Sequence, residues 1–115
     1  MGESWFFHVP KAGKLSRVAT LAAALSAVKR GGFLWLHYCQ PTKEDLSKLI
    51  QPFKLHPLSI EDCVDDDQIP KVEDFPGNTF CLFNAVDYSD GKLLIGEIDL
   101  FIGRNFLVSV SQRMP

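Results

Sequence analysis

Apolar residues are spaced in two ways along the chain, and this spacing predicts where strands and helices lie. Short apolar stretches predict strands at Trp5–Val9 and Phe33–Tyr38, and the second is apolar on both faces, as in a central strand. Between them the spacing becomes helical over Arg17–Arg30, and Gly31 and Gly32 follow as a stop signal. The first third of the chain is therefore predicted to fold as strand, helix and strand.

Two further helices are predicted in the middle of the chain. Thr42 and Asp45 have the spacing of a capping box, and the apolar residues after them repeat with helical spacing. Pro57 suits the first position of the next helix. We therefore expect helices over Thr42–Phe53 and Pro57–Val64.

The last third is predicted to form strands at Thr79–Asp87, Leu94–Ile102 and Phe106–Ser111. The turn sequences "SDGK" and "GRN" separate them, as in an antiparallel meander. Together the elements predict an α+β (or α/β) domain, with a mixed sheet of about five to six strands, a C-terminal antiparallel meander and flanking helices. With 115 residues the chain has the length of one domain, so residues 1–115 are expected to form a single domain.

In the middle strand of this meander, apolar and acidic residues alternate. Ile98, Leu100 and Ile102 alternate with Glu97 and Asp99. The alternation predicts that the apolar residues face the interior and that the two acids face water.

Composition excludes some classes of protein. Hydrophobic residues make up 46% and the net charge is −2, so neither nucleic acid nor an anionic membrane is expected as a partner. Cys39, Cys63 and Cys81 include no CxxC pair, which argues against a disulfide framework or a structural zinc site and fits a reducing cytosol. We expect each to be a small buried side chain. No signal peptide or membrane-spanning stretch is visible, so the chain is expected to be soluble.

The usual catalytic signatures are missing from the sequence. There is no Gly-rich phosphate loop, no G-x-S-x-G elbow and no H-E-x-x-H motif. His8, His37 and His56 stand apart from any partner at metal-ligand spacing, and His56 is expected to serve the start of a helix. Trp5 and Trp35 are expected in the core. The sequence therefore favours a protein that is not an enzyme, and it disfavours a carboxylate-metal hydrolase because the acids cluster on one segment.

That acidic segment, Glu61–Asp74, holds seven acids and one lysine. Its charge is −6, whereas the rest of the chain carries +4. If the predicted helix continues by one turn, Glu61 and Asp65 lie one turn apart, as do Asp62 and Asp66, and like charges at this spacing repel by about 0.2–0.5 kcal/mol. The macrodipole at a helix C-terminus disfavours the same carboxylates. A hard cation such as Mg²⁺ would relieve both penalties, and a solvated acidic loop without a ligand is the alternative reading.

Four stretches also carry a family resemblance. They are "WLH" at Trp35–His37, "HPLSIED" at His56–Asp62, "QIPKVE" at Gln68–Glu73 and "FIGRNFLVSV" at Phe101–Val110. In their order and spacing they resemble the amino-terminal cytosolic domain of CorA-type magnesium and divalent-cation transporters, over about residues 33–111. The chain departs from the family at Ile69, where an Arg is usual.

The resemblance implies a homopentamer in which this domain lines a funnel on the cytoplasmic side of the cell (inner) membrane, joined to its own stalk and membrane domain. It also implies that the family's acidic pair, here Glu61 and Asp62, faces a neighbouring subunit and helps to bind regulatory Mg²⁺. Whether Asp65, Asp66 or Asp67 adds to that site stays open.

The stalk, both membrane helices and the Gly-Met-Asn pore signature are not in this sequence. We therefore expect an excised domain that is a monomer or weak dimer, with little or no bound metal. Two alternatives remain, a domain of a Zn²⁺-type transporter of the same family and a stand-alone soluble interaction module. The sequence downstream of Pro115 would separate the transporter from the stand-alone module, whereas carboxylates alone do not identify the transported ion.

Overall fold

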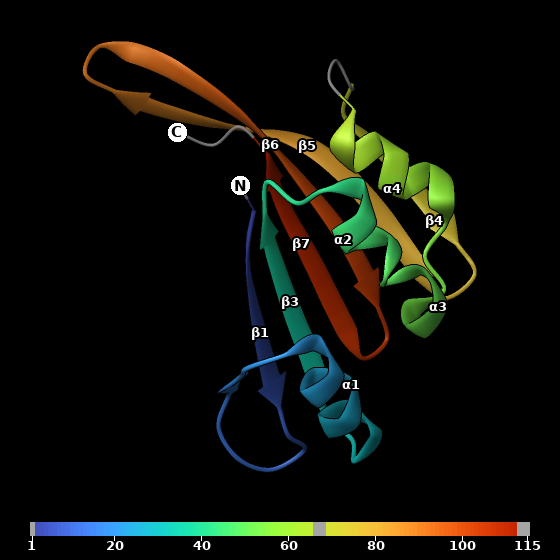
Figure 1. The fold of residues 1–115 in the computed structure, drawn as a ribbon. Helices are drawn as coiled ribbons and strands as arrows, with labels where there is room; N and C mark the ends of the chain where they lie inside the picture. The colour runs from blue at the N-terminus through green and yellow to red at the C-terminus, as the bar shows by residue number, and fades with distance from the viewer. Residues whose placement is uncertain (1, 66–68, 113–115) are drawn as a thin grey trace.

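The centre of the protein is one seven-stranded sheet in the order β2-β1-β3-β7-β6-β5-β4 (Figure 1). The computed structural model describes residues 2–65 and 69–112, apart from the side chain of Leu94. The strands are β1 (Glu3–Val9), β2 (Ser16–Val18), β3 (Phe33–Cys39), β4 (Lys71–Phe75), β5 (Asn78–Ser89), β6 (Lys92–Gly103) and β7 (Phe106–Gln112). The helices are α1 (Leu21–Lys29), α2 (Lys43–Ser47), α3 (Ile50–Phe53) and α4 (Pro57–Val64).

The strand pairing confirms the predicted α+β class with a mixed sheet and a C-terminal meander. β3 pairs with β7 in parallel, and the other neighbouring strands are antiparallel. Five strands were predicted with residue ranges, and the sheet contains two more. These are β2 and β4, which form its two edges. Two of the three residues of β2, Arg17 and Val18, were predicted to belong to the first helix. That helix begins later, at Leu21, because the Thr20 side chain accepts a hydrogen bond from the Ala23 backbone N–H at 3.1 Å and caps it there.

The single helix predicted over Thr42–Phe53 is divided into α2 and α3. Its start is as predicted, because Thr42 and Asp45 form the reciprocal capping box. Pro52 has no backbone N–H, so an uninterrupted helix would lose a hydrogen bond at this point. In the structure Pro52 lies in the first turn of the short helix α3, where no such bond is needed.

The helices cover one face of the sheet, and the core lies between them and that face (Figure 1). Its fully buried apolar side chains come from β3, β5, β6, β7, helices α1 and α2, and the turn between α2 and α3: Ala24, Leu34, Leu36, Leu46, Leu49, Phe80, Phe101, Val108 and Val110. Burying a large apolar side chain stabilises a fold by roughly 1.5–3 kcal/mol, so this layer supplies most of the stability.

The opposite face of the sheet, which we call the outer face, is also apolar. Its side chains include Trp5, Phe7, Trp35, Phe83 and Ile102. Trp35 is 38% exposed and Ile102 is 44% exposed, and Trp5 is half-buried. The prediction that Trp5 and Trp35 lie in the core is therefore wrong, because a strand that is apolar on both faces does not reveal which face the helices cover.

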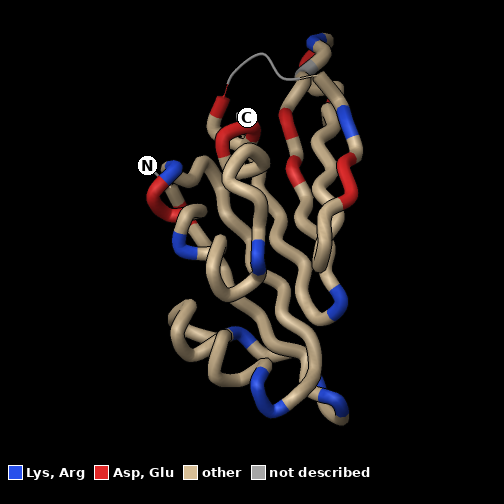
Figure 2. The backbone as a smooth tube through the Cα atoms, turned by 90° about the vertical axis from the view of Figure 1, so that its right-hand side faces the viewer, with Lys and Arg blue, Asp and Glu red and all other residues tan. Residues whose placement is uncertain are grey.

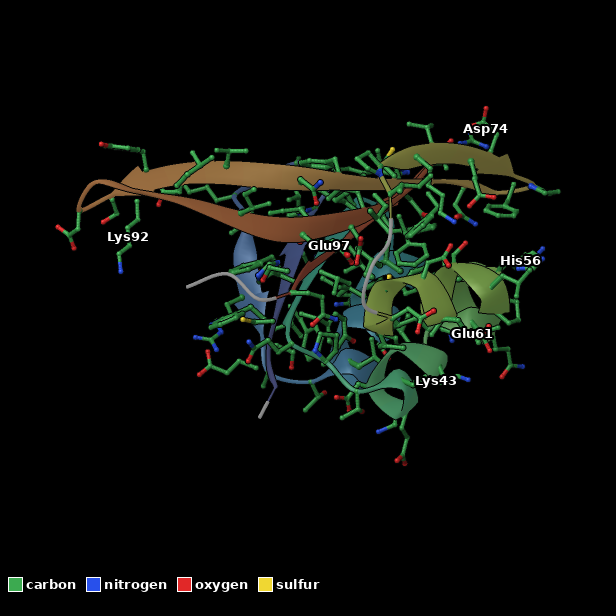
Figure 3. The ribbon with its side chains drawn as sticks, turned by 90° about the horizontal axis from the view of Figure 1, so that it is seen from above. Lys43, His56, Glu61, Asp74, Lys92 and Glu97 are labelled. Atoms are coloured by element: carbon green, nitrogen blue, oxygen red, sulfur yellow. The ribbon has the colours of Figure 1, made fainter. Side chains whose placement is uncertain are left out.

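The prediction for the middle strand of the meander is wrong for the same reason. Glu97 and Asp99 lie on the face of β6 toward the helices, with only 7% and 0% of their surface exposed. Ile98, Leu100 and Ile102 lie on the outer face instead. Figure 3 shows Glu97 on the side of β6 toward the helices, whereas Asp74 of β4 lies on the other side of the sheet.

Both predicted hairpin turns are present. Asp90 and Gly91 have positive φ angles of 52° and 75°, which suits the tight turn between β5 and β6. This hairpin extends well beyond the body of the molecule (Figure 1). At the second turn, the ring of Phe106 packs against the Cα of Gly103 and leaves no room for a side chain there.

Candidate functional site

Helix α4 carries the first two residues of the acidic segment, and its start is well defined. His56 caps it, because its Nδ1 accepts a hydrogen bond from the Leu58 backbone N–H at 3.1 Å. Pro57 occupies the first turn, as predicted. The ring of His56 also stacks on Phe75 of β4, with ring centres 4.9 Å apart. His56 therefore serves the start of a helix, as the sequence predicted.

One face of α4 packs on the domain and the other is open to solvent. Ser59, Ile60 and Cys63 are buried, whereas Leu58 and Glu61 are exposed. The side chain of Gln112, at the end of β7, donates a hydrogen bond to the backbone carbonyl of Cys63 at 2.9 Å. The helix is thus fixed on the sheet by its buried face and by a direct bond from β7.

Glu61 and Asp62 point away from each other and bind different lysines. Glu61 is exposed, and its Oε1 lies 3.3 Å from Nζ of Lys43 on α2 (Figure 3). Asp62 is half-buried, and its Oδ2 lies 2.5 Å from Nζ of Lys71 on β4. Lys71 also lies 3.4 Å from the Glu73 carboxylate. Successive helical residues differ in direction by about 100°, so this divergence follows from the helix itself.

The described residues include no group of three or more His, Cys, Asp or Glu side chains that could hold a metal ion. The helix also ends at Val64, and Asp65 follows in an extended conformation with φ −81° and ψ 145°. The further helical turn that would bring Glu61 and Asp65 together is therefore not formed. Asp66 and Asp67 lie outside the described residues.

Two acids that sequence reasoning did not place near the site lie beneath α4. Asp99 faces the buried thiol of Cys63, and Glu97 is its neighbour on the same face of β6. Burial raises the pKa of Asp99 to about 8, and the nearby Glu97 carboxyl group adds to the rise. Burial, together with Asp99, also raises the pKa of the Cys63 thiol. Alternation along a strand gives no signal for this arrangement, because it is equally compatible with either face being inward.

The prediction that each cysteine is buried is confirmed for Cys63 and is wrong for the other two. Cys39 and Cys81 are half-buried, and all three cysteines are free thiols. His8 is buried, and its Nε2 donates to the carbonyl of Gly31 at 2.9 Å.

On the outer face, the Ser109 hydroxyl joins two side chains of β3. Its oxygen accepts from Trp35 Nε1 at 2.9 Å and lies 2.7 Å from His37 Nδ1. The hydroxyl hydrogen is therefore free to bond Nδ1 of a neutral His37, and burial lowers the pKa of that ring. The cluster links β3 to β7.

Charge is divided along the molecule. In Figure 2 the Asp and Glu residues gather in the upper half of the view, and Lys and Arg residues predominate at the lower end. The acidic segment on α4 and β4 contributes to the acidic half. The small net charge thus conceals a marked separation of sign.

Comparisons with known proteins agree with this architecture. The family described as "CorA-like Mg2+ transporter protein" matches residues 30–115. A protein of Bacillus subtilis (strain 168) named as a metal ion transporter, YfjQ, is 32% identical over 75 residues, which are 65% of this chain and 23% of that protein.

Three solved structures have a similar fold. Full-length CmaX aligns with a TM-score of 0.73 and 16% identity, over 96% of this chain and 35% of its own. The complete CorA magnesium transporter of Methanocaldococcus jannaschii aligns with a TM-score of 0.68 and 15% identity, over 97% of this chain and 32% of its own. The soluble domain of the same transporter aligns with a TM-score of 0.62 and 14% identity, over 94% of this chain and 40% of its own.

The chain therefore spans between about a quarter and two fifths of the length of these proteins. Among the helices that the structure describes, none is long and apolar enough to cross a membrane.

Proposed function

Because the chain belongs to the family of CorA-like Mg²⁺ transporter proteins, we propose that it forms the regulatory cytosolic domain of a divalent-cation transporter. In this proposal the full protein is a homopentamer in the cell (inner) membrane, and the domain lines a funnel on the cytoplasmic side, below its own stalk and membrane segments. The observation that carries the proposal is the family match over residues 30–115, which includes the entire acidic segment Glu61–Asp74.

The acids of α4 suit a hard cation in chemistry but do not complete a site within one copy. Mg²⁺ commonly takes one or two protein carboxylates and retains several waters. Glu61 and Asp62 diverge and are paired with lysines on different elements, so one copy offers a single carboxylate to a given ion. The missing protein ligand would come from a neighbouring subunit.

Asp62 is the better ligand of the two in this proposal. Its side chain is 19% exposed and held in place by Lys71, whereas that of Glu61 is 52% exposed and paired with a surface lysine. A divalent cation bound between subunits supplies positive charge that offsets the negative ends of neighbouring α4 helices. Without it, like charges repel and the interface favours a looser arrangement, which is an electrostatic bias on a two-state element.

The test uses the full-length transporter with Asp62→Asn and, as a matched control, Asp74→Asn. Asp74 belongs to the same acidic segment but lies on the outer face of β4, where it accepts a hydrogen bond from Thr79. We expect Asp62→Asn to weaken inhibition of uptake by cytosolic Mg²⁺ several-fold, with maximal uptake unchanged and the control unaffected. An inhibition curve that is identical in Asp62→Asn and the unmodified protein would overturn the assignment and leave a solvated acidic segment.

A further inference from the structure

Asp99 is fully buried in a position where an ionised carboxylate is costly. It lies on the inner face of β6, and neither of its oxygens makes a hydrogen bond of ordinary geometry within the described part of the chain. Moving an ionised carboxylate out of water is unfavourable unless another group compensates its charge. Either a bound proton or a nearby cation would therefore stabilise the carboxyl group of Asp99 in this position.

The surroundings of Asp99 favour the proton. On the same strand, Glu97 lies two residues from Asp99 and on the same face. The Cα atoms of the two residues are therefore about 7 Å apart, and their side chains are long enough for the carboxyl groups to meet. From α4, Cys63 faces Asp99 and Asp62 lies close enough to act on it electrostatically. On β5 and β7, its cross-strand partners are the apolar Leu82 and Val110.

Among the described residues, Lys71 of β4 lies opposite Leu82, the cross-strand partner of Asp99, and it is bound to Asp62 and Glu73. Asn84 and Gln112 are the cross-strand partners of Glu97 and are uncharged. The residues around Asp99 thus present two further carboxyl groups, one thiol and no salt bridge to it within the described chain. A second negative charge so close raises the energy of ionising Asp99 still further.

We propose that Asp99 holds a proton at neutral pH in a carboxyl–carboxylate pair with Glu97, and that this proton is a latch that seats α4 on the sheet. The latch does not depend on metal binding by Glu61 or Asp62. When the proton leaves, two buried charges face α4 directly beneath Cys63, and Asp62 adds a third nearby. The helix then gains free energy by moving away from the sheet and admitting water.

The pKa of Asp99, which burial and Glu97 raise to about 8, agrees with this geometry. Below the ordinary carboxyl pKa of about 3.9, the folded and unfolded chains are both protonated at this residue. Between there and about pH 8 the folded chain keeps a proton that the unfolded chain has released, so stability falls as the pH rises through this range. Above this pH range, the proton on Asp99 no longer contributes to the stability of the folded chain. The latch thus responds close to physiological pH.

The first test follows the stability of this chain between pH 5 and pH 9 in EDTA, which removes divalent cations. Asp99→Asn mimics the protonated group, and Asp87→Asn on the exposed part of β5 is the matched control. We expect the urea midpoint of the unmodified chain and of the control to fall as the pH rises, and that of Asp99→Asn to change much less. Parallel curves for all three proteins would overturn the proposal.

The second test reads the proton itself and does not require the variant to fold. In D₂O, infrared spectroscopy of the unmodified chain should show the carbonyl band of a protonated carboxyl group at pH 6.5 that is lost by pH 9. No such band at pH 6.5 would overturn the proposal. Over the same range, hydrogen exchange of the α4 amides, corrected for intrinsic rates, should show more frequent opening at pH 9 by at least several-fold. Unchanged opening would show that the proton does not seat the helix.

Discussion

The ammonium group of Lys71 lies 2.5 Å from the carboxylate of Asp62, and this ion pair fastens helix α4 to the edge strand β4. The two side chains are 31% and 19% exposed, whereas those of Lys43 and Glu61 are 60% and 52% exposed. Water screens the first pair less, so the same charges attract more strongly there. On α4, Lys71 thus pairs with the half-buried Asp62, and Lys43 pairs with the exposed Glu61.

Replacing Lys71 by methionine is expected to destabilise the chain by about 0.5–1 kcal/mol, because Asp62 loses its partner while most of the apolar stem is kept. Lys43→Met is the matched control on the exposed pair and should change stability by less than about 0.5 kcal/mol. Urea unfolding at pH 7 measures both. Equal losses in the two variants would contradict the difference in screening.

The Lys71 pair also has a defined pH dependence. The hydrogen bond with Asp62 raises the pKa of Lys71. The stabilisation is therefore fully present below the ordinary lysine pKa of about 10.4 and is lost as the pH rises through the raised value. This window lies above that of Asp99, so the two effects can be told apart in one pH series.

Gly103→Ala is expected to destabilise the fold by about 1–3 kcal/mol, because the new methyl group would meet the ring of Phe106. The backbone of Gly103 does not have a positive φ, so the loss is steric rather than conformational. Adding Phe106→Leu to Gly103→Ala should recover part of the loss, and a double-mutant cycle by urea unfolding measures the coupling. Strict additivity of the two changes would argue against the contact.

The sequence located the main elements but not the edges of the sheet. The five strands predicted by position are all present, because each has a clear apolar alternation or an apolar run. β4 (Lys71–Phe75) was missed, since two of its five residues are acidic and Val72 is 70% exposed. β2 was missed because three residues at an edge carry too short a pattern to be distinguished from the start of a helix.

The candidate site was predictable in part. The family resemblance located Glu61 and Asp62, and helical geometry alone showed that they diverge. Their lysine partners could not be found, because Lys43 and Lys71 come from elements brought to α4 only by the fold. The buried position of Asp99 was hidden for a different reason, since a two-residue period is symmetrical between the faces of a sheet until the helices are placed.

We expect this chain to be a monomer or weak dimer in dilute solution, although its outer face exposes Trp35, Phe83 and Ile102. The exposed apolar residues of that face are interrupted by the buried hydroxyls of Ser109 and Ser111. A stable homo-oligomer generally needs a large and well-packed apolar interface. Sedimentation equilibrium at micromolar concentration measures the state, and a stable pentamer would contradict this expectation.

The position of β7 has a consequence for synthesis on the ribosome. It joins β3 to β6 in the sheet, and its Ser109 bonds His37 across 72 residues of sequence. At typical rates of translation, β7 is synthesised on the order of several seconds after β3. Until then the β2-β1-β3 ribbon has an open edge and an unfilled core side. This domain therefore depends on β7 to close its sheet, and its earlier strands are open to mispairing or to chaperones in that interval.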